Sequence, residues 1–400
     1  MSWFSNLSRP IGYLLRDLIV WGLGSAGWIS RGYEVRLPEL SYATPETLNS
    51  LQDTLRIVLR AIAPLERLQF HVRCDGDFHG QFTSYAVDTS KVSNAWVKRV
   101  REERLQRYTA LSQQGKLRRL RLFIFRSRKV ALPIRGWSYA RLERDLDETL
   151  AQQSAEFADW ARGTGDLLRP FGIELCPLTD ADHFRLLAHT FNPSLEARPE
   201  FDPLAWFDPE RPLLESVWQS EAVGHRDTGF TLDGTEQAIL VMSRPPQMTR
   251  PGILAPLVQP GFRNFTLTLT IEPLQIETVI RQAEESFRRV EGDLARDRRV
   301  GDEAVLEKKR LRAKALREGF LKPFHFRFVV RTWAAEPVEL RSRVLAFKQA
   351  FQAMAGAQYY EPNLPTTCKQ LFEQTWPGWL GSPYPHFKLY AEDAWLADLL

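Results

Sequence analysis

The fold is decided by a stretch in which apolar and polar side chains alternate without a break: Phe265-Thr266-Leu267-Thr268-Leu269-Thr270-Ile271. Successive side chains of an extended strand point to opposite faces, so this pattern places the threonines on one face and the apolar residues on the other. The same alternation occurs in Leu68-Gln69-Phe70-His71-Val72-Arg73. Both stretches predict strands of a sheet that packs one face on helices and leaves the other face in water.

Helical patterns accompany both strands. Residues 44–62 combine a capping Thr, a Pro at the first helical position and leucines at helical spacing, which predicts a helix before the first strand. After the second strand, an apolar stripe over 276–294 and a charge-rich segment over 302–320 predict a helical hairpin. A strand over 324–330 and a Pro-started helix over 337–354 follow. Each half therefore reads as strand, helix, strand, helix.

These patterns favour an α+β fold made of two consecutive two-layer β-α-β (ferredoxin-like) units with long helices and a charged helical hairpin. Pro-rich stretches supply the expected boundaries. The predicted parts are an N-terminal aromatic and amphipathic segment (1–30), a first unit (31–190), a Pro-rich linker with a hairpin at Asp233-Gly234 (191–262), a second unit with the charged helical hairpin (263–360) and a loop-rich segment (361–400).

The N-terminal segment is interrupted by Arg16 and Asp17 and does not fit a membrane span. Its apolar spacing predicts an amphipathic turn of helix over 11–19, followed by a Gly-rich hairpin. An interfacial membrane foot is the functional alternative, because aromatic rings favour interfaces. Its aromatic residues are Trp3, Phe4, Trp21 and Trp28.

Composition points to an ordinary globular protein: 44% of the 400 residues are hydrophobic and 26% are charged. The three cysteines, Cys74, Cys176 and Cys368, are too far apart for zinc spacing, and their odd, sparse count argues against a disulfide framework. We therefore expect a reducing compartment and a cytoplasmic protein.

A phosphate-binding loop needs a Gly-rich turn followed by Lys and then Ser or Thr. The Gly115-Lys116 pair lacks both other parts, because Ala110 stands at the first glycine position and Leu117 at the hydroxyl position. Asp75, Asp77 and His79 are better explained by a turn than by a metal loop. Helix capping likewise explains Asp180 and Asp182, beside His183, better than acid–base chemistry does. We expect no catalytic, cofactor-binding or metal-binding residue in this chain.

Basic residues are concentrated between Lys98 and Lys129. This segment contains twelve of them and only two acidic residues, Glu102 and Glu103. Such a patch is typical of docking to an acidic protein, to anionic lipid or to nucleic acid. For nucleic acid, Arg119 and Arg121 are expected to share a strand face with Phe123 and Phe125, as in sheet platforms that stack bases. The alternative is a solvated helix and a covered strand. The candidate docking or anion-binding residues are Lys98, Arg99, Arg101, Arg104, Arg107, Arg118, Arg119, Arg121, Arg126 and Arg128.

The order of elements resembles the N-terminal half of conjugative-transfer and type IV secretion ATPases, including the TraC-type pilus-assembly proteins and the VirB-type family. The resemblance is diffuse and spans nearly the whole chain. It is carried by Leu15-Arg16-Asp17-Leu18 leading to Gly32-Tyr33-Glu34-Val35, Phe265 to Pro273 with its charged hairpin, Phe328-Val329-Val330 followed by Glu336 to Phe351, and Pro362-Asn363 through Trp376-Pro377-Gly378.

The resemblance implies a docking function, in which this region holds the ATPase at the cytoplasmic side of the inner-membrane secretion complex. ATP and Mg would then belong to a C-terminal motor that this chain lacks, as in a truncated form. The implied partners are inner-membrane secretion subunits, the motor itself and possible further copies of the chain. A nucleic-acid-binding protein that uses the basic patch is the alternative, and a hydrolytic enzyme of another type is a third hypothesis.

Overall fold

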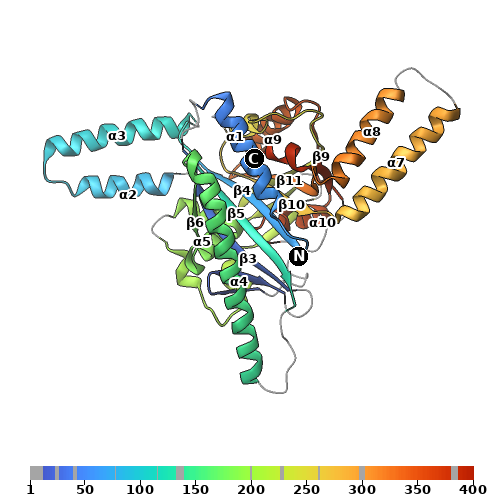
Figure 1. Ribbon diagram of the computed structural model, residues 1–400. Coiled ribbons are helices and arrows are strands. Elements are labelled where there is room, and N and C mark those ends of the chain that lie inside the picture. The colour runs from blue at the N-terminus through green and yellow to red at the C-terminus, as the bar shows by residue number, and fades with distance from the viewer. Residues whose placement is uncertain are drawn as a thin grey trace.

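The computed structural model describes residues 12–22, 27–38, 43–76, 78–114, 116–131, 139–198, 201–225, 229–259, 262–296, 302–379 and 386–400. It is a mixed helix and strand protein, as predicted, and its strands form one antiparallel sheet of 13 strands (Figure 1).

The sheet runs continuously through both halves of the chain. Its first half is β1 (Gly12–Leu15), β2 (Leu18–Trp21), β3 (Gly27–Arg36), β5 (Arg119–Val130) and β4 (Glu66–Asp75), in spatial order. Its second half continues with β10 (Phe265–Pro273), β11 (Pro323–Ala334), β9 (Thr235–Arg244), β8 (Gly229–Leu232) and β7 (Ala222–His225). Three short strands add to this path: β6 (Glu174–Pro177) on β3, β12 (Gln358–Tyr360) on β9 and β13 (Leu389–Glu392) on β11.

The two halves repeat the same strand order when read inward from the two ends of the sheet. In each half a short hairpin (β1/β2 or β7/β8) leads to the first long strand (β3 or β9). The third long strand of that half (β5 or β11) pairs with the first, and the second long strand (β4 or β10) pairs with the third. The halves meet at β4 and β10, which pair from Cys74 opposite Phe265 to Leu68 opposite Ile271. The two alternating stretches of the sequence are therefore neighbours at the centre of the sheet.

Helices cover both faces of the central strands. The apolar face packs against α1 (Pro45–Arg60), α4 (Tyr139–Leu168), α9 (Pro337–Gln352) and α11 (Asp393–Ala397). The opposite face packs against α5 (Asp180–Phe191), α6 (Leu213–Val217) and α10 (Pro365–Glu373). Short 3₁₀ turns connect some of these elements, at Arg169–Phe171, Pro193–Ala197, Pro203–Trp206 and Ala255–Val258.

Two helical hairpins project from the body in different directions (Figure 1). The first consists of α2 (His79–Ser90) and α3 (Ala95–Gln113) and connects β4 to β5. The second consists of α7 (Ile276–Arg296) and α8 (Asp302–Arg317) and connects β10 to β11. The long polar pattern over about 94–113 predicts α3, and the α7/α8 hairpin was also predicted; the structure shows Asn94 as the N-cap of α3. The helix α2 was missed, because its apolar residues show little helical patterning.

The prediction that the polar face of the central strands meets water is wrong. Gln69, His71 and Thr268 are all at most 1% exposed, because α5, α10 and the segment after α10 cover them. Some of the polar groups bond within the protein: His71 bonds Thr268 at 3.1 Å, and the buried Arg331 donates to Gln237 at 2.9 Å. Others on this face, His71 Nε2 and Thr266 Oγ1, are buried without a hydrogen-bond partner among the described residues. Alternation correctly placed the two faces but did not reveal that both are buried.

The predicted helical turn over residues 11–19 is also wrong. Residues Arg16 and Asp17 both have positive φ, 55° and 61°, and form a two-residue turn between β1 and β2. Turns with positive φ at both central positions match the twist of paired strands. Trp21 is 1% exposed and is therefore unavailable for an interfacial membrane foot. Trp3 and Phe4 lie outside the described residues.

Two further expectations have clear outcomes. The hairpin at Asp233-Gly234 is confirmed, since Leu232 pairs with Thr235 across it. The segment after residue 361 is less loop-like than expected, because it supplies α10, β13 and α11 to the body. In the part of the chain that the structure describes, no helix is long and apolar enough to cross a membrane.

Candidate functional site

The basic residues of α3 lie on an exposed helix that projects from the body (Figure 1). No residue of α3 is buried. Arg99 pairs with Glu103 of the same helix at 3.2 Å, and Arg101 lies over the ring of Tyr85 in α2. Arg104 and Arg107 are exposed to solvent, as the predicted docking patch requires, whereas Lys98 is half-buried.

The hairpin also exposes apolar surface. Trp96, at the beginning of α3, is 74% exposed, and Tyr108 is 43% exposed. Large aromatic side chains that are accessible beside arginines are typical of the anchor residues of protein interfaces. This combination distinguishes the α2/α3 hairpin from a helix that is merely solvated.

The beginning of β5 holds three of the candidate arginines in different environments. Arg118 donates to the carbonyl oxygens of Val258 and Gln259, at 2.6 and 2.8 Å, and so joins the two halves of the chain. Arg121 pairs with Asp75 at 3.2 Å. Arg119 is exposed.

Arg126 and Arg128 are separated from the rest of the patch and share the buried carboxylate of Glu66. Arg126 donates to both carboxylate oxygens, at 2.7 and 2.8 Å, and Arg128 donates through Nε at 2.8 Å and also contacts Glu156. Burial alone raises the pKa of Glu66, but the hydrogen bonds from Arg126, Ala63 and Arg128 outweigh it and hold that pKa below its usual value. These two arginines therefore stabilise the fold.

The base-stacking platform expected on β5 is not formed. Phe123 and Phe125 are 3% and 0% exposed, because α5 and the segment after α10 pack on them. A ring that is buried in the core is not accessible to a base. The predicted alternative, a strand face covered by a helix, is what the structure has.

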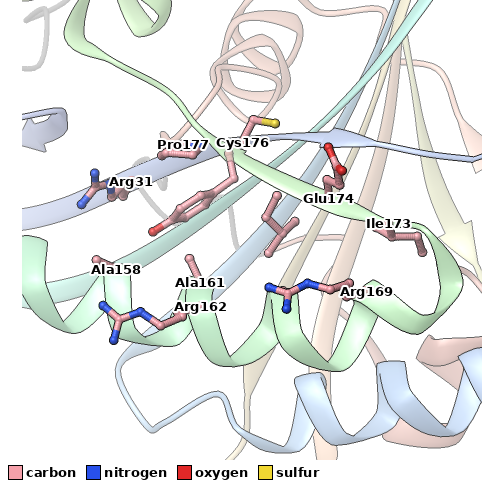
Figure 2. A pocket seen from close by; sticks show the side chains of 12 residues that line it. Arg31, Ala158, Ala161, Arg162, Arg169, Ile173, Glu174, Cys176 and Pro177 are labelled. Atoms are coloured by element: carbon pink, nitrogen blue, oxygen red, sulfur yellow. The ribbon is translucent and has the colours of Figure 1, made fainter.

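The cavity shown in Figure 2 lies between α4, β3 and β6 and has a volume of about 570 Å³. Small side chains of α4, Ala158 and Ala161, line it beside Tyr33. Three arginines also line this cavity, and each has a partner within the protein: Arg31 with Ser154, Arg162 with Asp159 and Arg169 with Asp166. This cavity therefore differs from a site for an anion in that none of its three arginines lacks a partner within the protein.

Asp75 and Asp182 have structural partners, whereas Oδ1 of Asp180 is buried without a hydrogen-bond partner in the described part of the chain. Asp75 pairs with the buried Arg73 at 2.7 Å, while Asp77 lies outside the described residues. Thr179 and Asp182 form the expected capping box, and His183 accepts the main-chain N–H of Gly32 at 3.1 Å. Burial lowers the pKa of His183 to about 3. Burial and the neighbouring Asp17 raise the pKa of Asp180 to about 6.

Sequence reasoning also missed a loop over residues 374–379 that we call the Trp loop. Its Trp376 is 1% exposed and packs against Phe191 of α5, with ring centroids 4.8 Å apart. The carbonyl oxygen of Gly378 accepts hydrogen bonds from Ser30 and from the Trp21 indole, at 2.8 and 3.1 Å. The Trp loop therefore attaches the end of the chain to the first half of the sheet. The Trp-Pro-Gly-Trp sequence was its only signal.

Within the described residues, no group of three or more His, Cys, Asp or Glu side chains is arranged to hold a metal ion. No protein-family model matches the chain, and no curated protein matches it.

Proposed function

We propose that this chain is the docking and scaffolding N-terminal region of a conjugation (type IV secretion) ATPase, which anchors the motor to the inner-membrane secretion and pilus-assembly complex. The observation that carries the docking part is the α2/α3 hairpin, which extends away from the sheet with an exposed tryptophan and solvent-facing cations. The assignment to conjugation rests on the sequence resemblance.

The architecture supports a scaffold. A continuous sheet with helices on both faces gives the hairpins a rigid base, and rigid elements position binding residues more accurately than loops do. We further propose that each half is a ferredoxin-like unit. In the first half the strands lie in the order β6-β3-β5-β4, and in the second in the order β12-β9-β11-β10, which in both is fourth, first, third and second along the chain.

Charge reversal on α3 tests the docking proposal. We expect the Lys98→Glu, Arg101→Glu, Arg104→Glu triple variant to bind inner-membrane secretion subunits at least roughly tenfold more weakly than the wild type, because like charges then face each other across the interface. The affinity is measured by immobilising the wild-type or variant chain, adding the purified subunits over a range of concentrations and quantifying the fraction bound.

The matched control places the same three reversals on the other hairpin, as Lys308→Glu, Arg310→Glu and Lys314→Glu in α8. We expect this variant to retain binding. If the wild type does not bind the subunits, or if the α3 variant binds them as tightly, the docking proposal fails.

A nucleic-acid-binding protein remains the second candidate, because the cations of α3 face solvent. Phosphate contacts predict that affinity for single strands falls by about 0.7 log units per log unit of salt for each contact. Fluorescence anisotropy with a labelled oligonucleotide over a salt series measures this slope. A steep slope that the α3 reversal abolishes supports this candidate; absence of binding at low salt eliminates it.

A further inference from the structure

A second cavity, of about 520 Å³, opens on the side of the first half of the sheet, where β5 begins and β3 ends. We call it the arginine cavity, because five arginines from different elements line it. They are Arg36 of β3, Arg119 and Arg121 of β5, Arg185 of α5 and Arg198 after the 3₁₀ turn Pro193–Ala197. A cavity of this volume is within the range of small-molecule sites.

Two of these guanidinium groups are held in fixed positions. Arg185 donates to both carboxylate oxygens of Asp202, at 3.1 and 3.0 Å. Arg121 pairs with Asp75, which also holds the buried Arg73. Cations whose positions are fixed before binding lose little conformational entropy when a ligand arrives.

Two other guanidinium groups have no such partner. Among the described residues, the side chains of Arg119 and Arg198 make no hydrogen bond or ion pair, and both are exposed. Guanidinium groups that converge on one cavity repel each other, and an anion placed between them removes that repulsion. Arg36, the fifth arginine, pairs with Glu174 at 3.8 Å, and two carboxylates, Glu34 and Asp182, also line the cavity. The cavity thus combines three paired cations with two, Arg119 and Arg198, that make no ion pair among the described residues.

We infer that the arginine cavity binds a small ligand through a diphosphate group. The planar fork of arginine matches phosphate oxygens, and each phosphate supplies more charge and more acceptors than a carboxylate does. The volume leaves space beside the diphosphate for the rest of the ligand, whether a nucleoside or a lipid headgroup. Gln81 of α2 also lines the cavity, so the ligand would contact the base of the projecting hairpin. This inference stands independently of the proposed docking function.

Inorganic pyrophosphate is the probe for the test. We expect it to bind the full chain with micromolar affinity and to raise the melting temperature, because a ligand that binds only the folded state stabilises it. The Arg119→Gln, Arg198→Gln variant should bind at least roughly tenfold more weakly, since glutamine cannot replace the charged hydrogen bonds of a guanidinium group. Isothermal titration calorimetry measures both affinities. Both residues are exposed, so the variant is expected to fold.

The control carries the same two changes on α8, as Arg310→Gln and Arg317→Gln, which are exposed and do not line the cavity, and is expected to bind pyrophosphate like the wild type. Vesicles containing diacylglycerol pyrophosphate, a lipid whose headgroup is a diphosphate, distinguish the sources of the diphosphate. Binding to vesicles that pyrophosphate displaces identifies a lipid headgroup; binding of pyrophosphate alone identifies a soluble diphosphate. No binding of pyrophosphate at millimolar concentration, or equal loss in both variants, overturns the inference.

Discussion

The Trp376→Ala variant is expected to lose about 3–5 kcal/mol of unfolding free energy, the range for removing a large buried aromatic side chain. Trp376 is 1% exposed and lies among the rings of Phe191, Phe372 and Trp379. The cavity that remains cannot close easily, because the main chain of the Trp loop is fixed by Gln69, which donates to the Trp376 carbonyl at 3.1 Å and accepts from the Gly378 amide at 2.8 Å. Urea denaturation followed by circular dichroism measures the loss.

Trp96→Ala is the matched control, because the same truncation removes a side chain that is 74% exposed. Surface substitutions of this kind usually change stability by less than about 0.5 kcal/mol. A Trp376→Ala variant as stable as this control would show that the Trp loop does not hold the end of the chain on the sheet.

Gly378 also constrains the backbone conformation of the Trp loop. Its φ is +67°, and an added Cβ would lie 2.8 Å from Cδ1 of Ile19. A side chain there meets both a strained backbone and a steric overlap with the core. Gly378 thus lets the loop approach the sheet closely enough for its carbonyl to reach Ser30.

The sequence predicted the elements of this fold better than their assembly. The alternation at 265–271 and 68–73 identified β10 and β4 because side-chain period is a local property. It did not show that these strands pair with each other, since residues far apart in the chain decide that pairing. The same limit explains the error about the polar face: Thr268 and His71 look solvent-exposed until α5 and the Trp loop are placed on them.

The candidate site, too, was predicted only in part from the sequence. The density of basic residues predicted a charged surface, and the exposure of α3 agrees with that. Charge counting did not separate Arg119, which is exposed, from Arg126, which is 8% exposed beside Glu66. The difference arises from the strand register, because Leu68 lies opposite Arg126 and Glu66 lies opposite Arg128, which brings one carboxylate to both arginines. That register is a property of the folded sheet.

The Glu66→Gln variant should lose about 3 kcal/mol of unfolding free energy. Removing one member of a buried ion pair costs about 3–5 kcal/mol because the remaining charge is left without compensation. The Glu66 side chain is fully buried, and the side chain of Arg126 alone is 9% exposed. We expect the lower end of the range, because Arg128 is 26% exposed and keeps its contact with Glu156. Glu103→Gln, which removes an exposed carboxylate paired with Arg99, is the control and should cost less than about 0.5 kcal/mol.

The pH dependence of this stability loss distinguishes the contribution of the Glu66 charge from the contribution of its packing. The pKa of Glu66 is lower in the folded chain than its ordinary value of 4.5, so its carboxylate stabilises the fold at pH values above 4.5. This contribution is lost as the pH falls through the lower folded pKa. The stability difference between wild type and Glu66→Gln should therefore be constant from pH 7 to about pH 5 and should shrink in more acidic solution. Urea titrations at a series of pH values measure it, and a difference that stays the same at every pH would assign the loss to packing instead of to the ion pair.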